Sequence, residues 1–252
     1  MIIPTVRDYA FLRYFIQNAI SNGFNTDRLY VLLITEDHAE KDKMKSMISA
    51  LGLEGEVFGK RERNSWLAAH GIDEFSDLIP NLSHAETSFG LLFMQTQGFE
   101  YGCFIDDDTK PLTGTNFFAT HLQSLNFKGS IPVVSSDKAW VNVLYQDFKR
   151  HRLYPRGYPY CAMDETIHIS NTYVDNVVGS QGLWTGVPDL DAVRTLAQGN
   201  LDGVSSIRMR RSDFTSNFCV AKGDFMTISS MNFAFRREII PAFYQLPMDD
   251  NE

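Results

Sequence analysis

The sequence predicts an α/β protein built on an open, mostly parallel sheet that helices flank. Short apolar runs alternate with amphipathic segments through the first half of the chain. Most of the apolar runs are continuous, as expected of strands that are buried on both faces. The segments between them have the apolar spacing of helices. Strands that alternate with helices favour crossover connections, and therefore a parallel sheet.

The order of the elements follows from these runs and from the residues that end them. Gly23, Gly52 and Gly98 stand where three helices are expected to stop. Ser83 and Glu86 have the spacing of a capping box at the start of a helix. We predict strands over 1–5, 28–35, 55–59, 101–105 and 131–136, and helices over 8–23, 39–52, 83–98 and 114–125.

The second half of the chain is less regular, because Gly, Pro, Asn and Asp are frequent between residues 150 and 224. We expect loops and short strands there, built onto the sheet. Residues 224–246 predict a strand, a turn and a helix. We interpret the 252 residues as one domain, because this length suits a single large domain.

Composition restricts the class of partner. Hydrophobic residues make up 44% of the chain, enough for a sizeable core. The 31 acidic and 23 basic residues give a net charge of −8, so no nucleic acid is expected as a partner. No apolar run reaches the length of a membrane span, and the three cysteines form no CxxC pair. We therefore expect a cytoplasmic protein whose association with membranes of the secretory pathway would be peripheral.

The stretch "GCFIDDDTKP", residues 102–111, places three carboxylates directly after a predicted buried strand. Parallel sheets bind ligands beyond the carboxyl ends of their strands. In an Asp-x-Asp pattern, Asp106 and Asp108 offer oxygen ligands to a hard divalent cation. A solvated acidic turn would give the same pattern. A phosphatase of the haloacid dehalogenase type is another alternative, although Lys110 stands where that pattern has Thr.

Longer motifs follow the acidic triplet. They are "YPRGYPY" (154–160), "QGLWTGVPDLDA" (181–192) and "SSMNFAFRREIIPAFYQLPM" (229–248), with "IIPTVR" and "RERN" earlier in the chain. In this order they resemble the reversibly glycosylated polypeptide family, which includes the plant UDP-arabinopyranose mutases. The resemblance spans nearly the whole chain.

The resemblance implies a GT-A-type, Rossmann-like fold, a UDP-sugar of the UDP-arabinose or UDP-glucose type, and Mn²⁺ or Mg²⁺ as cofactor. It implies a nucleotide-binding half over 1–135 and a sugar- or acceptor-binding half over 136–252. Metal ligation is assigned to Asp106 and Asp108. The implied substrate- or nucleotide-binding residues are Thr5, Arg7, Glu36, Asp37, Arg63, Asp106, Asp107 and Trp184.

Arg156, Asp189 and Asp191 are the predicted catalytic residues. The planar guanidinium of Arg156 would grip diphosphate oxygens and stabilise departing UDP, whereas sugar attachment at this arginine is an expectation from the family alone. Asp189 or Asp191 would contact sugar hydroxyls or act as a base. Trp184 would lie against a sugar face, or in the core. The alternative is purely structural: Arg156 would be an exposed surface cation, and Asp189 and Asp191 would be turn residues.

These observations predict a metal-dependent mutase of the UDP-arabinopyranose type or a (self-)glycosyltransferase. The alternative is a non-catalytic nucleotide-sugar-binding subunit of a homo- or hetero-oligomer. The chain departs from the family at Thr109, where Cys is usual, and at Gly186, where plant members tend to have Asn. Family members continue past the position of Glu252 with an acidic/aromatic block and a histidine region, so the chain is expected to be truncated there relative to the family.

Overall fold

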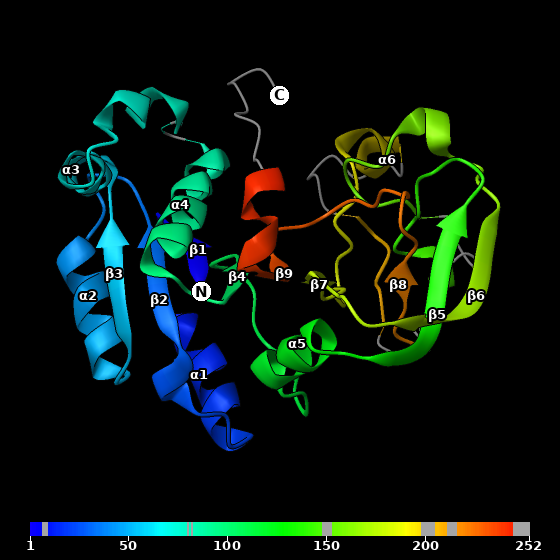
Figure 1. Ribbon diagram of the computed structural model, residues 1–252, viewed down its shortest axis with the longest axis horizontal. Helices are drawn as coiled ribbons and strands as arrows, with labels where there is room; N and C mark the ends of the chain where they lie inside the picture. Colours follow the sequence, from blue (N-terminus) through cyan, green and yellow to red (C-terminus); the bar gives the residue numbers. More distant parts are fainter. Residues whose placement is uncertain are drawn as a thin grey trace. The chain divides into compact units, whose positions relative to one another are not determined.

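The structure is a computed structural model that describes residues 1–6, 10–79, 81, 83–147, 153–197, 205–210 and 216–243 (Figure 1). The chain divides into two compact units. The first unit comprises Met1–Asn126, Val177–Gln181 and Ser230–Glu252. The second comprises Phe127–Asn176 and Gly182–Ser229. The first unit is therefore not one continuous piece of chain, because two later segments return to it.

The first unit contains a six-stranded sheet in the order β3-β2-β1-β4-β9-β7. Its strands are β1 (Ile2–Pro4), β2 (Tyr30–Ile34), β3 (Glu54–Phe58), β4 (Tyr101–Ile105), β7 (Gly179–Gln181) and β9 (Asn232–Arg236). The pairs β1–β2, β1–β4 and β2–β3 are parallel, whereas β9 is antiparallel to β4 and to β7. The prediction of a mostly parallel α/β sheet is confirmed.

Helices cover this sheet on both faces (Figure 1). They are α1 (Leu12–Ser21), α2 (Lys41–Ala50), α3 (Lys60–Ala69), α4 (Ser88–Gln97) and α5 (Phe117–Leu125), with the 3-10 helices η1 (Thr26–Arg28), η2 (Asp73–Leu78), η3 (His84–Thr87) and η7 (Arg237–Ala242). Successive strand residues point to opposite faces. Ile3 and Leu33 accordingly pack with α1, α2 and α5, while Ile2 and Leu32 pack with α4 and the partly buried side chains of α3 and η7.

Aromatic rings fill the face that α4 covers. The ring centroids of Phe58 and Phe89 are 4.8 Å apart, and those of Phe104 and Phe235 are 5.3 Å apart. Such separations are the favourable range for aromatic pairs. Gly102 of β4 makes room for this layer, because a Cβ atom there would lie 2.4 Å from Cζ of Phe235.

Two helical segments differ from the sequence prediction. No helix was expected over α3, whose buried residues are Arg63 and Leu67, so its apolar periodicity is weak. The helix expected after β9 is instead the short 3-10 helix η7, which contains Pro241. Proline lacks an N–H and clashes with the preceding turn of an α-helix, which explains the shorter form. Residues 244–246 of that expected helix lie outside the described residues.

The second unit has its own three-stranded sheet, in the order β6-β5-β8. Its strands are β5 (Gly129–Ser136), β6 (Ile167–Val174) and β8 (Cys219–Val220); its helices are η4 (Tyr145–Asp147), η5 (Tyr160–Ala162) and α6 (Ala192–Ala197). β5 and β6 pair antiparallel along their whole length. The strand expected over 131–136 is β5, but it belongs to this separate sheet and not to the main one. Loops and short strands were expected after residue 150, so the eight-residue strand β6 was not predicted.

Across the described ranges, no helix is both long enough and apolar enough to cross a membrane.

The space at Gly102 can be tested directly. Gly102→Ala is expected to destabilise the protein by about 1–3 kcal/mol, because the added methyl group must displace the buried side chains of Phe235 and Met94. Urea unfolding measures this change. Glu100→Ala, an exposed neighbour, is the control and should stay within about 0.5 kcal/mol of wild type. Equal effects of the two variants would contradict the tight contact.

Candidate functional site

The acidic triplet forms a hydrogen-bonded turn at the carboxyl end of β4. The backbone N–H and the hydroxyl of Thr109 donate to the carbonyl oxygen of Asp106, at 3.3 and 2.8 Å. Asp106 and Asp107 are half-buried, whereas Asp108 is exposed. The triplet therefore lies at the edge of the sheet where parallel sheets bind ligands.

Thr5 ties this turn to the first strand. Its hydroxyl donates to a carboxylate oxygen of Asp107 at 2.8 Å, and its backbone N–H donates to the carbonyl oxygen of Ile34 at 2.9 Å. Thr5 is itself buried. The hydrogen bond orients Asp107 toward the sheet, so two predicted site residues are brought together. Arg7, also predicted here, lies outside the described residues.

A buried charged cluster follows the next strand. The guanidinium of Arg63, on α3, donates to the carboxylate of Glu86, and a second of its nitrogens donates to Oδ1 of Asn81 at 2.9 Å. Arg63 and Glu86 are both buried. Glu36 adjoins them, and its burial, together with the Glu86 carboxylate, raises its pKa. Glu86 therefore links two predicted site residues, since it interacts with both Arg63 and Glu36.

Asp37 occupies a different environment from Glu36. It is exposed, and its carboxylate accepts the backbone N–H of Arg61 at 3.1 Å while Lys41 Nζ lies 3.5 Å away. The Arg61 hydrogen bond, assisted by the lysine, lowers the pKa of Asp37. Asp37 thus holds the first turn of α3 near the end of β2.

The acidic turn suits a hard divalent cation. Carboxylate oxygens are the ligands that Mg²⁺ and Mn²⁺ prefer, and Mg²⁺ is often held by one or two carboxylates plus substrate phosphates. Asp106 and Asp108 can supply such a pair, since Asp107 is engaged by Thr5. Among the described residues, no group of three or more His, Cys, Asp or Glu side chains is arranged for metal binding.

The "RGYP" motif folds into a tight turn in the second unit. The backbone N–H of Tyr158 donates to the carbonyl oxygen of Pro155 at 3.1 Å, and Gly157 has a φ of +81°. That conformation favours glycine at the third position of a turn. The turn presents Arg156, whose side chain is 67% exposed. Its guanidinium lies 3.2 Å from the carboxylate of Asp189.

The "PDLDA" motif packs against this turn, so the structure brings the three predicted catalytic residues into one region. The backbone N–H of Arg156 donates to the carbonyl oxygen of Asp189 at 2.9 Å. The hydroxyl of Tyr160 donates to Asp191 at 2.8 Å, and Arg194 Nε lies 3.3 Å from the same carboxylate. Burial raises the pKa of Asp189, and Arg156 opposes this shift.

Trp184 lies in the core of the second unit. It packs, partly buried, against a cluster that includes Val143, Leu153 and Met209. Its indole N–H is buried and has no hydrogen-bond partner in the described part of the protein. The structure thus places the ring in a packing role, and contact with a sugar stays a prediction.

The sequence reading did not identify two further polar groups. His121 of α5 is buried, and its two ring nitrogens lie 2.7 Å from Oδ1 of Asn232 and 2.9 Å from the hydroxyl of Ser180. Glu165, in the second unit, is also buried and accepts the hydroxyl of Tyr154 at 3.0 Å. Neither has the spacing of a known motif. Their neighbours give no signal either, since Glu165 stands between Asp164 and Thr166, and His121 follows Thr120.

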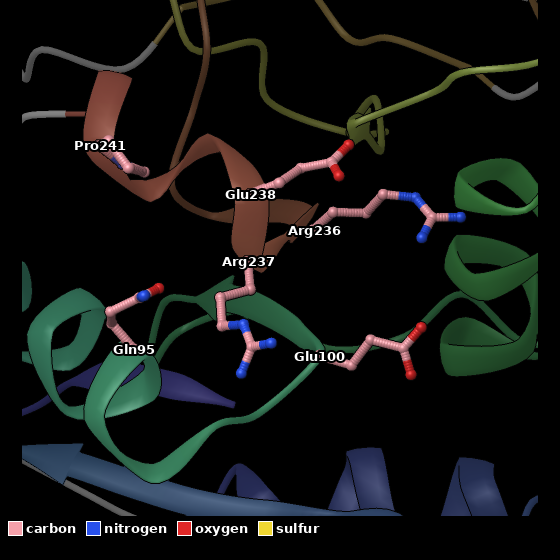
Figure 2. Close-up of a pocket in the computed structure, with 6 residues that line it drawn as sticks. All are labelled: Gln95, Glu100, Arg236, Arg237, Glu238 and Pro241. Carbon is pink, nitrogen blue, oxygen red and sulfur yellow. The ribbon is translucent and has the colours of Figure 1, made fainter.

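A surface cavity of about 230 Å³ lies at the opposite end of β4 from the acidic turn. Figure 2 shows the side chain of Arg237 between those of Gln95 and Glu100, with Arg236 and Glu238 above them. Tyr101, the first residue of β4, pairs with Arg236. This cavity is therefore not part of the candidate site.

The fold and the acidic turn together define an α/β protein with a candidate ligand site at the carboxyl edge of a mostly parallel sheet. The chain belongs to the reversibly glycosylated polypeptide family, whose family model matches residues 18–252. It is 26% identical over 262 aligned residues to a protein of Pisum sativum named probable UDP-arabinopyranose mutase 1. The alignment covers 100% of this chain, which spans 59% of the length of that relative.

The buried ion pair between Arg63 and Glu86 is expected to support the fold. Arg63→Met should destabilise the protein by about 3–5 kcal/mol, because it leaves the buried carboxylate of Glu86 without its guanidinium partner. The matched control is Lys43→Met, which breaks an exposed ion pair with Glu40 and should cost about 1 kcal/mol or less. Denaturant unfolding compares the two, and similar losses would show that burial of the pair is unimportant.

The raised pKa of Glu36 predicts a pH dependence. The folded protein holds this proton more tightly than the unfolded chain does, so stability due to Glu36 is present near its ordinary pKa of 4.5 and is lost as pH rises through the folded value. Glu36→Gln should flatten the dependence of unfolding free energy on pH above 4.5. The exposed control Glu40→Gln should leave the wild-type curve unchanged. A wild-type slope in Glu36→Gln would contradict the raised pKa of Glu36.

Proposed function

We propose that this chain binds a UDP-sugar at the carboxyl edge of the first unit's sheet, with a divalent cation, and acts as a nucleotide-sugar mutase or glycosyltransferase. Family membership and the name of the relative support the reaction class. The observation that carries the proposed site is the hydrogen bond from Thr5 to Asp107, which holds the acidic turn against β1.

Asp106 and Asp108 would hold Mn²⁺ or Mg²⁺. When bound, such a cation supplies charge neutralisation to the diphosphate. Thr5 keeps the Asp107 carboxylate turned toward the sheet, which limits repulsion of the incoming phosphates. Glu36 and Asp37, at the end of β2, are proposed to contact the nucleoside. Arg63 contributes by fixing Glu86 beside Glu36.

In the mutase reaction, the bond between sugar C1 and the UDP oxygen breaks, and its electron pair leaves with UDP. The 4-hydroxyl oxygen of the sugar then bonds to C1 and loses its proton, the bond between C1 and the original ring oxygen breaks as that oxygen takes up a proton, and a UDP oxygen attacks C1 again. In a transfer reaction, a hydroxyl of an acceptor attacks C1. Both need stabilisation of the departing UDP, for which the exposed guanidinium fork of Arg156 has the right chemistry. The carboxylates of Asp189 and Asp191 are suited to binding sugar hydroxyls.

A titration of UDP tests the site. Mn²⁺ is expected to tighten UDP binding to wild type by about tenfold or more, equivalent to about 1.4 kcal/mol, and Asp108→Asn should abolish that gain. Isothermal calorimetry measures the four affinities. Asp27→Asn, in the 3-10 helix that precedes β2 and therefore at the other edge of the sheet, is the matched control and should retain the gain. Equal affinities of wild type with and without metal would overturn the metal site.

The same samples distinguish an enzyme from a binding subunit. Incubation with UDP-arabinopyranose and Mn²⁺ should yield the furanose form or free UDP, detected by chromatography, and Arg156→Lys should slow either product by about tenfold or more. Lysine keeps the charge but loses the bidentate fork. Tight binding of UDP without turnover would favour the non-catalytic subunit instead.

A further inference from the structure

We propose that Asn232 is a binding residue for the diphosphate of the nucleotide, and that His121 is the positioning residue that orients it. This proposal rests on the proposed function, because it concerns the same edge of the first unit's sheet. It adds a hydrogen-bond donor from β9 beside the three carboxylates of the acidic turn.

Register places Asn232 beside the acidic turn. It opens β9, and its Cα pairs with that of Ile105, the last residue of β4. Residues directly opposite each other in an antiparallel pair have Cα atoms about 5 Å apart. Asp106 is the next residue after Ile105, so Asn232 lies within about one strand spacing of the turn.

The side chain of Asn232 points to the face of the sheet that carries Thr5. Cross-strand partners share a face, and Ile105 packs in the cluster covered by α1, α2 and α5. Ile3 packs in the same cluster, and Thr5 is two residues further along the same extended chain. Thr5 and Asn232 thus approach the turn from the two strands that flank β4.

His121 determines how the side-chain carboxamide of Asn232 is oriented. Burial lowers the pKa of His121, so the imidazole is neutral near pH 7 and carries one N–H. Its Nε2 lies 2.7 Å from Oδ1 of Asn232, an atom that only accepts, so Nε2 is the donor. Its Nδ1 then accepts the hydroxyl of Ser180 at 2.9 Å. The carboxamide oxygen of Asn232 is therefore already engaged.

The amide nitrogen of Asn232 remains to donate. In the part of the chain that the structure describes, it makes no hydrogen bond to protein, and it is not among the buried polar atoms that lack a partner, so it reaches solvent. The carbonyl oxygen of Asn232 accepts the side-chain amide of Gln181 at 3.1 Å, which also fixes the backbone. The residue is held on three sides and exposes only its donor.

The chemistry of the neighbouring turn indicates the ligand. Three adjacent carboxylates repel a phosphate unless charge and hydrogen-bond donors offset them. An oriented, uncharged N–H donor matches the acceptor oxygens of a diphosphate and holds them without competing for the cation. The ligand of this amide is therefore a phosphate oxygen of a nucleoside diphosphate, and not the cation itself.

Asn232→Asp separates the binding role from a structural one. Aspartate keeps an oxygen acceptor for His121 but loses the amide donor, so the fold should retain its thermal midpoint. UDP affinity in the presence of Mn²⁺ should fall about tenfold or more, and uridine affinity should be nearly unchanged, because uridine has no phosphate. Asn232→Ala, which adds no charge, should weaken UDP about threefold to tenfold. Asn126→Asp, at the other end of these strands, is the matched control and should bind UDP as wild type does.

His121 is tested by the same titration. His121→Phe removes the donor that orients the carboxamide and should weaken UDP about threefold, while His121→Gln, which still offers an N–H, should restore most of the affinity. Unchanged UDP affinity in Asn232→Asp, or equal losses for uridine and UDP, would overturn the assignment of Asn232. Equal behaviour of the Phe and Gln variants would overturn the role of His121. Failure of wild type to bind UDP with Mn²⁺ would instead overturn the proposed function.

Discussion

The hydrogen bond from Thr5 to Asp107 is the contact on which the proposed site depends. It joins residues that follow two neighbouring parallel strands, and it exists only because β1 and β4 end at the same edge of the sheet. When parallel strands are buried on both faces, their side chains are mostly apolar, and polar functional side chains are found mainly at the strand ends. The fold therefore concentrates Thr5, Glu36, the acidic turn and Asn232 along one edge, although they are far apart in the chain.

Several charged side chains near this edge of the sheet lie next to other charged groups. Arg63 neutralises Glu86, Glu86 in turn raises the pKa of Glu36, and Lys41 pairs with Glu62 at 2.7 Å. A buried ion pair is costly to break but adds little net stability in itself, which makes it a device for fixing geometry. In the second unit, Arg156 with Asp189 and Arg194 with Asp191 repeat this arrangement at a more exposed place.

The sequence could predict the sheet because β2 and β4 are short, continuous apolar runs bounded by polar segments. It could locate the acidic triplet for the same reason, since the triplet directly follows such a run. It could not predict α3, because an arginine occupies the buried face of that helix. Nor could it predict the pairing of Thr5 with Asp107 or of His121 with Asn232, since each depends on which strands become neighbours. Nor does the sequence reveal that the "RGYP" and "PDLDA" motifs contact each other. The structure shows that the backbone N–H of Arg156 donates to the carbonyl oxygen of Asp189.

The position of β9 has a consequence for how the protein reaches its native state. β9 pairs with the inner strand β4 but is encoded near the end of the described chain, about half a chain length later. During synthesis, β4 must wait with one side of its backbone unsatisfied until this segment emerges from the ribosome. Contacts between such distant segments slow folding. The nascent polypeptide thus carries an unpaired, apolar strand edge while about half a chain length is translated.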